Sequence, residues 1–321
     1  MKVVVTGGAG FIGANLCRVL CGSREVTEVV VVDDLSTGSL RNLDGLPVTL
    51  IKESILDRSA LDVACVGAGS IVHLAAIPSV PRSVENPLAS HAANATGTLE
   101  VLEAARRHGV GHLVVASSSS VYGANLVLPK HEGLCAEPMS PYAVSKLATE
   151  SYALAYRQCF GLSVLALRFF NVFGPLQPAG HAYAAVVPVF IDAALSGRPI
   201  PVNGDGTQSR DFTFIGSVTS VITDAVLRQV CASGPVNLAF GTRTTVLGLI
   251  DELERILGRS LPRGHRPPRA GDVPHSQADS NRLSVLFPRL EPVRFSDGLR
   301  ATVDWFRATM PASSRGGLAS R

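Results

Sequence analysis

The chain has 321 residues, of which 46% are hydrophobic and 17% charged, enough for a sizeable core in one large domain or two interlocked ones. Its net charge of +3 is scattered along the chain, which argues against a nucleic-acid groove. Apolar runs stay far below the roughly 20 residues of a membrane span, and the six cysteines form neither a CxxC pair nor a metal-ligand spacing, so we expect a cytoplasmic protein without membrane contact, disulfides or bound metal.

The first half of the chain alternates apolar strands with helices. Residues 2–6 and 28–34 predict two buried strands, joined by a glycine turn and a helix over 11–22, so the opening MKVVVTGG is not a signal peptide. The pattern recurs, with strands predicted over 71–76, 112–123 and 162–174 and helices near 87–108 and 141–160. Continuous apolar strands are typical of a parallel sheet covered on both faces. We therefore predict an α/β fold, a doubly wound parallel sheet of the Rossmann type.

The pattern of residues and predicted elements changes after about residue 174. Glycine, proline and short strands dominate residues 197–212, and helices are predicted near 183–196, 217–231 and 246–257. This composition indicates a smaller region interleaved with the last strands of the sheet. Residues 311–321 have the composition of a mobile tail.

A glycine-rich turn follows the first predicted strand. In GGAGFIG, the glycines from Gly7 to Gly13 permit a tight turn and a close backbone approach to a pyrophosphate at a helix N-terminus. Asp33 follows Gly13 by twenty residues, at the end of the second strand, where a carboxylate accepts hydrogen bonds from an adenosine ribose. Because Asp33 and Asp34 would repel a 2′-phosphate, the sequence predicts NAD rather than NADP.

The segment SPYAVSK, residues 140–146, combines a tyrosine and a lysine at helical spacing. Ser140 and Pro141 predict the N-cap and first turn of a helix, which would place Tyr142 and Lys146 on one face. An ammonium about 4 Å from a phenol contributes roughly 1 to 4 kcal/mol, which would lower a tyrosine pKa of about 10 by roughly 1 to 3. Tyr142 is therefore predicted to accept the proton of a sugar or alcohol hydroxyl.

The chain resembles the extended short-chain dehydrogenase/reductases, and within them the NAD-dependent sugar-nucleotide epimerases and dehydratases. The resemblance covers about residues 1–307 and rests on GGAGFIG, VVDDLSTG, HLAA, NATGTLEVLEAA, SSSSVYG, PYAVSK and RFFNVFGP, in that order. The later segments AYAAVVP, NGDGTQSRDF and RAGDVPHSQAD are similar to those of UDP-hexose and UDP-N-acetylhexosamine 4-epimerases. We therefore expect an NAD-binding domain over 1–174 with a return segment near 211–240, and a sugar-nucleotide-binding domain over 175–210 and 241–310.

The resemblance also implies the residues of the site. Tyr142, Lys146 and Ser118 would be catalytic, with Ser118 hydrogen-bonding the C4 oxygen of the sugar. The positions matching cofactor contacts are Gly7, Gly10, Phe11, Ile12, Gly13, Asp33, Asp34, Ser36, Thr37, Gly38, Ser54, Ile55, Leu74, Ala75, Ala76, Asn94, Ser117, Tyr142, Lys146 and Phe170. The positions matching substrate contacts are Ser118, Ser119, Ser120, Asn171, Val187, Asn203, Arg210, Arg269, Asp272 and Ser276. Ser54 stands where the family usually has an aspartate, which weakens the adenine contact and leaves NAD as the expected cofactor.

The residues after Ser118 bear on the reaction. Related 4,6-dehydratases carry Asp-Glu in the next two positions and related decarboxylases a glutamate in the second, whereas this chain has Ser119 and Ser120. A serine cannot replace a carboxylate near pH 7, so the resemblance favours 4-epimerisation. Related UDP-glucuronate epimerases carry an arginine that matches the C6 carboxylate, and residues 172–185 of this chain contain none. Ser276 stands where related enzymes restricted to UDP-glucose and UDP-galactose carry a tyrosine, so the resemblance implies room for an N-acetyl group.

We predict NAD-dependent 4-epimerisation of a UDP-sugar, UDP-GlcNAc/UDP-GalNAc or UDP-Glc/UDP-Gal or both, through a 4-keto intermediate with tightly bound NAD. Three alternatives stay open: a UDP-glucuronate 4-epimerase, a dehydratase or 4-ketoreductase acting on another nucleotide sugar, and a non-catalytic NAD-binding regulatory protein. The helices near 87–108 and 141–160 resemble those that form a dimer's four-helix bundle, so a homodimer is expected.

Overall fold

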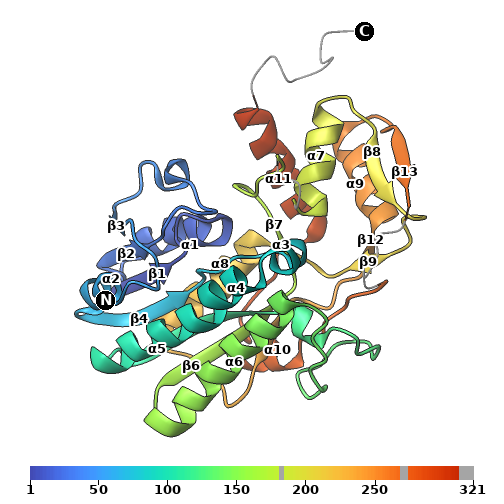
Figure 1. Ribbon diagram of the computed structural model, residues 1–321. Coiled ribbons are helices and arrows are strands. Elements are labelled where there is room, and N and C mark those ends of the chain that lie inside the picture. The colour runs from blue at the N-terminus through green and yellow to red at the C-terminus, as the bar shows by residue number, and fades with distance from the viewer. Residues whose placement is uncertain (181–183, 268–273, 311–321) are drawn as a thin grey trace.

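The computed structural model describes residues 1–180, 184–267 and 274–310 (Figure 1). Within these residues, seven parallel strands form one sheet in the order β11–β6–β5–β4–β1–β2–β3. Their bounds are β1 Lys2–Thr6, β2 Glu28–Val32, β3 Val48–Ile51, β4 Ala68–His73, β5 His112–Ser118, β6 Ser163–Phe169 and β11 Val236–Leu238. The predicted doubly wound parallel sheet is confirmed. The tail predicted to be mobile, 311–321, lies outside the described residues.

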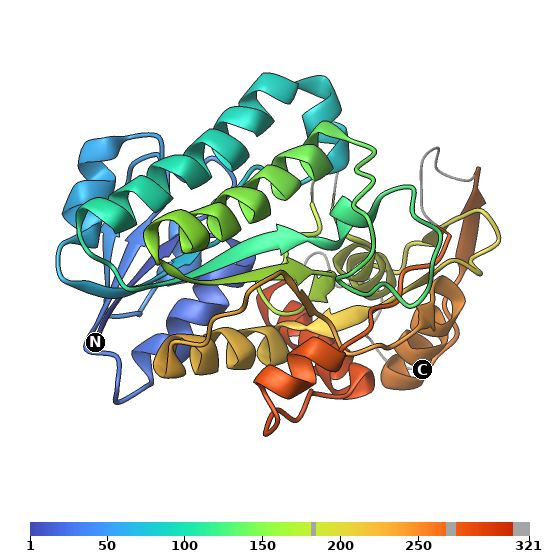
Figure 2. The same ribbon diagram turned by 90° about the horizontal axis from the view of Figure 1, so that it is seen from below.

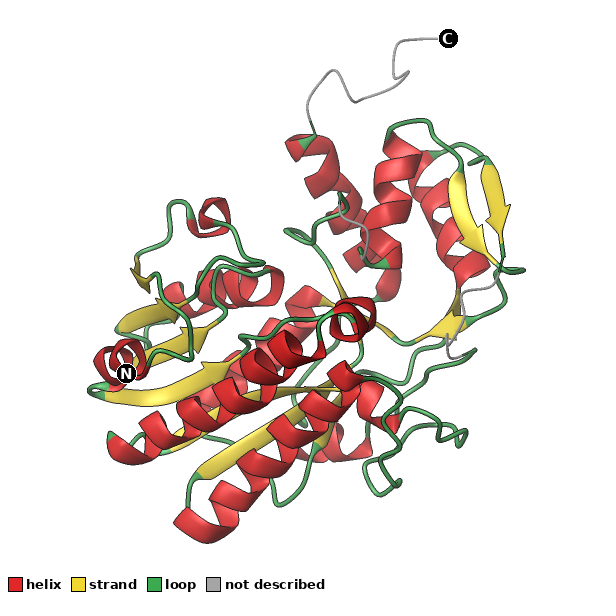
Figure 3. Cartoon of the chain, viewed as in Figure 1, coloured by secondary structure: helices red, strands yellow, loops and turns green. Residues whose placement is uncertain are grey.

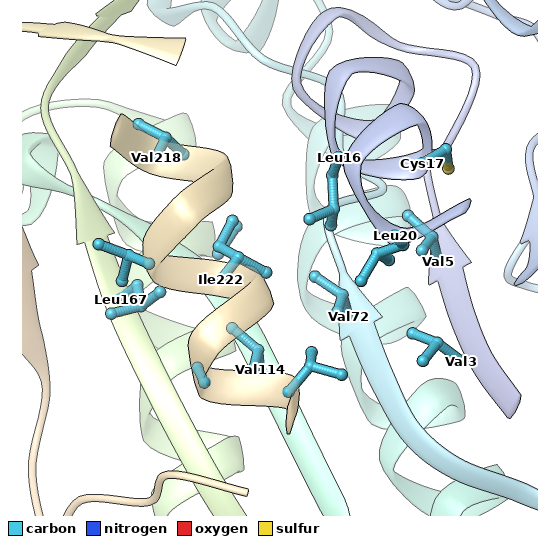
Figure 4. Packing of buried hydrophobic residues seen from close by; sticks show 14 of the residues in the cluster. Val3, Val5, Leu16, Cys17, Leu20, Val72, Val114, Leu167, Val218 and Ile222 are labelled. Atoms are coloured by element: carbon cyan, nitrogen blue, oxygen red, sulfur yellow. The ribbon is translucent and has the colours of Figure 1, made fainter. Parts of the chain in front are cut away.

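Helices cover both faces of this sheet, α1 and α8 on one and α2, α5 and α6 on the other (Figure 2). Their bounds are α1 Phe11–Cys21, α2 Arg58–Cys65, α5 Gly97–Arg107, α6 Pro141–Phe160 and α8 Ile215–Arg228. Successive side chains of a strand point to opposite faces. Val3 and Val5 of β1 therefore pack toward α1 and α8 (Figure 4), whereas Val4 belongs to the core beneath α2 and α5.

The strands predicted over 28–34 and 71–76 end slightly early, at Val32 and His73, and two other predicted strands differ more. β5 ends at Ser118 rather than at residue 123, because the Ser118 hydroxyl accepts a hydrogen bond from the Ser120 N–H and caps a 3₁₀ helix, η3 (Ser119–Tyr122). The strand predicted over 162–174 is divided into β6 and β7 (Asn171–Phe173), and β7 pairs with β10 (Phe212–Phe214) outside the main sheet.

The helix predicted near 87–108 is interrupted. It comprises α4 (Pro87–His91), a π-helical segment η2 (Ala92–Thr96) and α5, and it follows the short helix α3 (Val80–Glu85). A π-helical segment inside a helix shifts the faces of its residues and is frequent at functional sites.

The second half of the chain adds a smaller group of elements beside the sheet (Figure 3). Their bounds are α7 Val186–Leu195, β8 Ile200–Asn203, β9 Ser209–Arg210, β12 Thr244–Thr245, α9 Val246–Leu257, β13 Arg263–Arg266 and α11 Phe295–Thr309. The rings of Phe173, Phe212 and Phe295 join this group to β7 and β10, with centroids 5.5 to 6.3 Å apart. In the described ranges, no helix has both the length and the apolar character needed to cross a membrane.

Several elements had no prediction: the short elements η1 Leu40–Leu43, β3, α2 and α10 Asn281–Leu286, and the 15-residue helix α11. β3 is a four-residue edge strand with only partly buried side chains, and α2 has eight residues. Such short segments carry too little periodicity to separate a strand or helix from a loop.

Candidate active site

A cavity of about 830 Å³ lies at the carboxyl ends of β1, β2, β4, β5 and β6. Open parallel sheets bind ligands at this end, where the strand order reverses direction. Among the residues expected at the site, those that line it are Gly7, Gly10, Phe11, Ile12, Gly13, Asp33, Asp34, Ser36, Thr37, Ser54, Ile55, Leu74, Ala75, Ala76, Ser117, Ser118, Tyr142, Lys146 and Phe170. The structure thus brings the glycine turn, the β2 carboxylates and the Tyr142–Lys146 helix to one cavity.

The glycine turn has the shape of a pyrophosphate cradle. Gly7 has φ +73° and lies so close to the loop after β4 that a Cβ would stand 2.7 Å from the Ala75 nitrogen. A Cβ on Gly13 would stand 2.2 Å from the Gly7 carbonyl oxygen. Gly10 is the N-cap of α1 without a side-chain cap, so the first N–H groups of this helix remain available to an anion. These features fit the diphosphate of a dinucleotide.

Asp33 lies at the position expected for a ribose contact. Its carboxylate accepts hydrogen bonds from the Ala9 N–H at 2.8 Å and the Leu35 N–H at 2.9 Å, one on each oxygen. Burial raises the pKa of Asp33, and these two N–H groups offset part of the rise. Gly38 packs against Ala9, with room for no Cβ, and so supports the turn from outside the cavity.

Helix α6 begins as the sequence predicts. The Ser140 hydroxyl accepts a hydrogen bond from the Ala143 N–H at 3.1 Å, and Pro141 occupies the first turn. Lys146 is buried, and its ammonium donates a 2.8 Å hydrogen bond to the Ala116 carbonyl at the end of β5. Burial lowers the pKa of Lys146 to about 8.

The sequence predicted that Lys146 lowers the pKa of Tyr142. For the protein residues alone, this prediction is wrong. Burial raises the pKa of Tyr142, and the hydroxyl of Ser118 offsets part of that rise. The physical reason is that burial removes water from the phenol and so disfavours its charged form, and this desolvation has the largest effect on its pKa.

The serines after β5 have distinct positions. Ser118 lines the cavity, and its Oγ accepts hydrogen bonds from the N–H of Ser120 at 3.1 Å and from its hydroxyl at 2.9 Å. Ser119 and Ser120 are half-buried and are not part of the cavity lining.

Asn94, expected near the nicotinamide, does not line the cavity. Its side chain accepts from the Ile77 N–H at 2.8 Å and donates to the Ile77 carbonyl and to the Ser145 hydroxyl, at 3.2 and 2.9 Å. It therefore holds the loop after β4 against α6, and its contribution to the site is indirect.

A buried polar chain continues from Asn94 and had no sequence prediction. The Asn94 carbonyl accepts from Thr98, whose hydroxyl lies 3.0 Å from Nε2 of His73, and Nδ1 of His73 lies 2.8 Å from the Thr6 hydroxyl. Burial lowers the pKa of His73 to about 3, so the imidazole is neutral at physiological pH.

Three residues that were expected to bind the substrate do not line this cavity. Arg210 donates to the carbonyls of Ser209 and Pro274, and the Ser276 N–H donates to the same Ser209 carbonyl at 3.0 Å, so Arg210 and Ser276 are neighbours. The Asn171 side chain donates to the Asp211 carbonyl at 3.4 Å.

Val187 is buried in the core of the smaller group, and Asn203 lines a second cavity of about 370 Å³ with Gln208 and Arg266. Arg269 and Asp272 lie outside the described residues.

Sequence reasoning missed a part of the cavity wall made by two loops and the helices that follow them. The loop residues are Ile77, Pro78, Ser79, Gln177 and Pro178, and Arg82 of α3 and Ala185 at the start of α7 join them. The loop residues come soon after HLAA and RFFNVFGP, and that position after a strand was the available signal. Ser79 has φ +106°, an uncommon conformation for serine, and caps α3.

Several known proteins are similar to this chain in sequence and in fold. The model of the NAD dependent epimerase/dehydratase family matches residues 3–238. The chain is 34% identical to a UDP-glucose 4-epimerase of Mycolicibacterium smegmatis over 320 residues, which cover 96% of this chain and 99% of the relative.

Two solved structures are similar over nearly the whole chain. A UDP-N-acetylglucosamine 4-epimerase from Methanobrevibacter ruminantium, in complex with UDP-N-acetylmuramic acid, is 35% identical with a TM-score of 0.90, covering 96% of this chain and 99% of that one. A UDP-glucuronic acid 4-epimerase from Bacillus cereus, in complex with UDP-glucuronic acid and NAD, is 30% identical with a TM-score of 0.88, covering 97% and 100%. The cradle, the β2 carboxylate and this family match agree that the cofactor is NAD. The chain belongs to the NAD dependent epimerase/dehydratase family.

Proposed function

We propose that the protein catalyses the 4-epimerisation of a UDP-sugar through a transient 4-keto intermediate. The observation that carries this proposal is that Tyr142, Lys146 and Ser118 share one cavity with the pyrophosphate cradle. The kinship with 4-epimerases over 96% of the chain supports it.

Each of the three side chains has a defined task in this proposal. Bound NAD supplies the chemistry of hydride removal and return at C4. Tyr142 accepts the proton of the C4 hydroxyl and gives it back after the sugar has turned its other face. Because burial raises the pKa of Tyr142, its phenolate needs positive charge nearby, and Lys146, with a pKa of about 8, keeps most of its proton at neutral pH. Ser118 accepts hydrogen bonds from both Ser120 donors, so its own hydrogen can be donated to the Tyr142 oxygen and, in the loaded site, to the C4 oxygen of the sugar.

The distribution of carboxylates supports epimerisation over elimination. Among the described residues, the acidic members of the cavity lining are Asp33, Asp34 and Glu53, which follow β2 and β3. In the sheet, β2 is three strands from β5, or about 14 Å at ordinary strand spacing. These carboxylates therefore cannot act at C5 or C6 of a sugar held by Ser118, and the adjacent Ser119 and Ser120 cannot act as acids or bases near pH 7.

For the substrate, we propose UDP-GlcNAc/UDP-GalNAc, with UDP-Glc/UDP-Gal as a second pair. The absence of arginine from residues 172–185 disfavours a uronate, and Ser276 is small. Residues 1–174 with 211–240 would bind NAD, while 175–210 and 241–310 would bind the sugar nucleotide. The neighbouring Arg210 and Ser276 lie in the second part.

We further propose a cytoplasmic homodimer. Helices α3, α4 and α6 pack together and expose the apolar side chains of Val84, Leu88, Val144 and Tyr152. Light scattering of the purified protein would give the mass of two chains, and a monomer mass would contradict this arrangement.

The decisive experiment incubates the purified protein with UDP-GlcNAc, UDP-Glc, UDP-GlcA and dTDP-Glc and separates the products by chromatography. We expect a C4 epimer from UDP-GlcNAc. The variant Tyr142→Phe should retain NAD without turnover, and Tyr152→Phe, an exposed tyrosine of the same helix, should keep full activity. The epimerase proposal fails if no UDP-hexose or UDP-hexosamine yields a C4 epimer, and conversion of UDP-GlcA alone would favour the glucuronate alternative.

A further inference from the structure

A buried ion pair lies beneath the catalytic groups. Glu150 of α6 and Arg168 of β6 each have a side-chain exposure of 4%. Arg168 binds the carboxylate with both arms of its guanidinium, Nε to Oε2 at 2.9 Å and Nη2 to Oε1 at 2.7 Å. Neither residue lines the cavity, so the pair touches neither cofactor nor substrate.

Glu150 ties the catalytic helix to the end of β5. It follows Lys146 by one helical turn and Tyr142 by two, so the three side chains lie on the same face of α6. The Ser117 hydroxyl donates to Oε2 of Glu150 at 2.8 Å, and the next residue in the strand is Ser118. The carboxylate of Glu150 thus accepts three donors that join α6, β5 and β6.

Arg168 contacts the segment that follows Ser118. Its guanidinium carbon lies 4.7 Å from the ring centroid of Tyr122, in the 3₁₀ helix that Ser118 caps. The Tyr122 hydroxyl in turn donates to Asn237 of β11 at 2.7 Å. Nη1 of Arg168 has no hydrogen-bond partner among the described residues, so this cation depends on the aromatic face and on Glu150.

We propose that Glu150 and Arg168 are positioning residues, which hold the Ser118 end of β5 and the Tyr142–Lys146 helix in fixed register for proton transfer. A buried pair is a poor device for stability, because apolar side chains of similar volume often serve as well or better. It is well suited to fix geometry, since a bidentate pair has one favourable arrangement. The inference rests on the proposed function in naming proton transfer as the step that the register serves.

The test separates stability from geometry. Glu150→Gln and Arg168→Met each leave one buried partner uncompensated, and both should melt at lower temperature. The double variant Glu150→Leu/Arg168→Met removes both charges and should recover the wild-type melting temperature. For the double variant we expect kcat to fall by roughly 10- to 100-fold, because small misplacements of catalytic groups have effects of that size. KM for the UDP-sugar and the NAD content should stay near those of the wild type, since only transition-state geometry is disturbed.

Asp224→Asn is the matched control, because Asp224 forms an exposed i,i+4 pair with Arg228 on α8, away from the cavity. This variant should keep both kcat and melting temperature. If the double variant regains kcat together with its melting temperature, the pair is only structural and the proposal is overturned.

Amide hydrogen exchange gives a readout that does not depend on turnover. The Ser120 N–H, bonded to the Ser118 hydroxyl, should exchange faster in the double variant than in wild type, while amides of β1 should not change. If wild type makes no C4 epimer, the proposed function has failed, and the exchange result alone then decides the positioning role. Unchanged exchange at residues 117–122 would overturn it.

Discussion

The Lys146 ammonium donates its hydrogen bond to the Ala116 carbonyl, 2.8 Å away, two residues before the serine at the end of β5. This contact joins helix α6, which carries Tyr142, to strand β5, which ends at Ser118. Because burial raises the pKa of Tyr142 in the protein itself, its phenolate depends on positive charge in the loaded site.

Lys146 should make the stability of the protein depend on alkaline pH. Its pKa is about 8 in the folded protein and 10.5 ordinarily, so between these values the unfolded chain binds more protons than the folded one. The contribution of Lys146 to the free energy of unfolding should therefore rise with pH over this window, by up to about 1.4 kcal/mol per pH unit. Urea unfolding of wild type and Lys146→Met from pH 7 to 10.5 measures this contribution as the difference between the two slopes. The slope of Lys146→Met should be the lower of the two, because buried thiols and phenols such as Cys65 contribute with the opposite sign in both proteins, and equal slopes would contradict the assignment.

Removing the Ser118 hydroxyl should change the pH profile of the reaction. This hydroxyl offsets part of the rise in the Tyr142 pKa, so in Ser118→Ala the alkaline rise of kcat should shift to higher pH. The variant should also lose roughly 100- to 1,000-fold in kcat, as expected when one hydrogen-bond donor to the reacting oxygen is removed. Ser220→Ala, which alters an exposed hydroxyl on α8, is the control. A profile unchanged in position would mean that Ser118 does not act on Tyr142.

Gly13→Ala should abolish NAD binding. Its Cβ would stand 2.2 Å from the Gly7 carbonyl oxygen, so the turn would have to open. Gly111→Ala is the matched control, because a Cβ there meets nothing within 4 Å. NAD released from the denatured protein and quantified by chromatography checks both. Full NAD content in Gly13→Ala would show that the turn can adapt.

His73 should contribute to acid unfolding. Its pKa is about 3 when folded and 6.5 ordinarily, so between these values the unfolded chain binds more protons. Stability should therefore fall as pH drops from 6.5 toward 3, by up to about 1.4 kcal/mol per pH unit. His73→Leu should flatten this dependence in denaturant titrations at several pH values. His91→Gln, at an exposed position of α4, should leave it unchanged, and an equal effect of both variants would contradict the role of burial.

Local patterns were sufficient for the parts of the site that one short segment builds. The glycine turn, Asp33 at the end of β2 and the Ser140 cap of α6 each depend on neighbouring residues and on backbone geometry that the sequence states directly. The doubly wound sheet follows for the same reason, since apolar strands and helices alternate along the chain.

Contacts between distant segments were decided by the tertiary structure. The direction of Lys146 toward Ala116, the internal use of Asn94 and the burial of His73 each require two or more elements to meet. The break between β6 and β7 likewise exists because β7 finds its partner in β10, some 40 residues later. The sequence by itself determined the alternation of strands and helices, the cofactor cradle and the Tyr142–Lys146 helix, because these are local. Only the tertiary structure decided which groups share a hydrogen bond and which are desolvated. Desolvation and charge pairing depend on residues that are distant in the sequence and meet only in the folded protein.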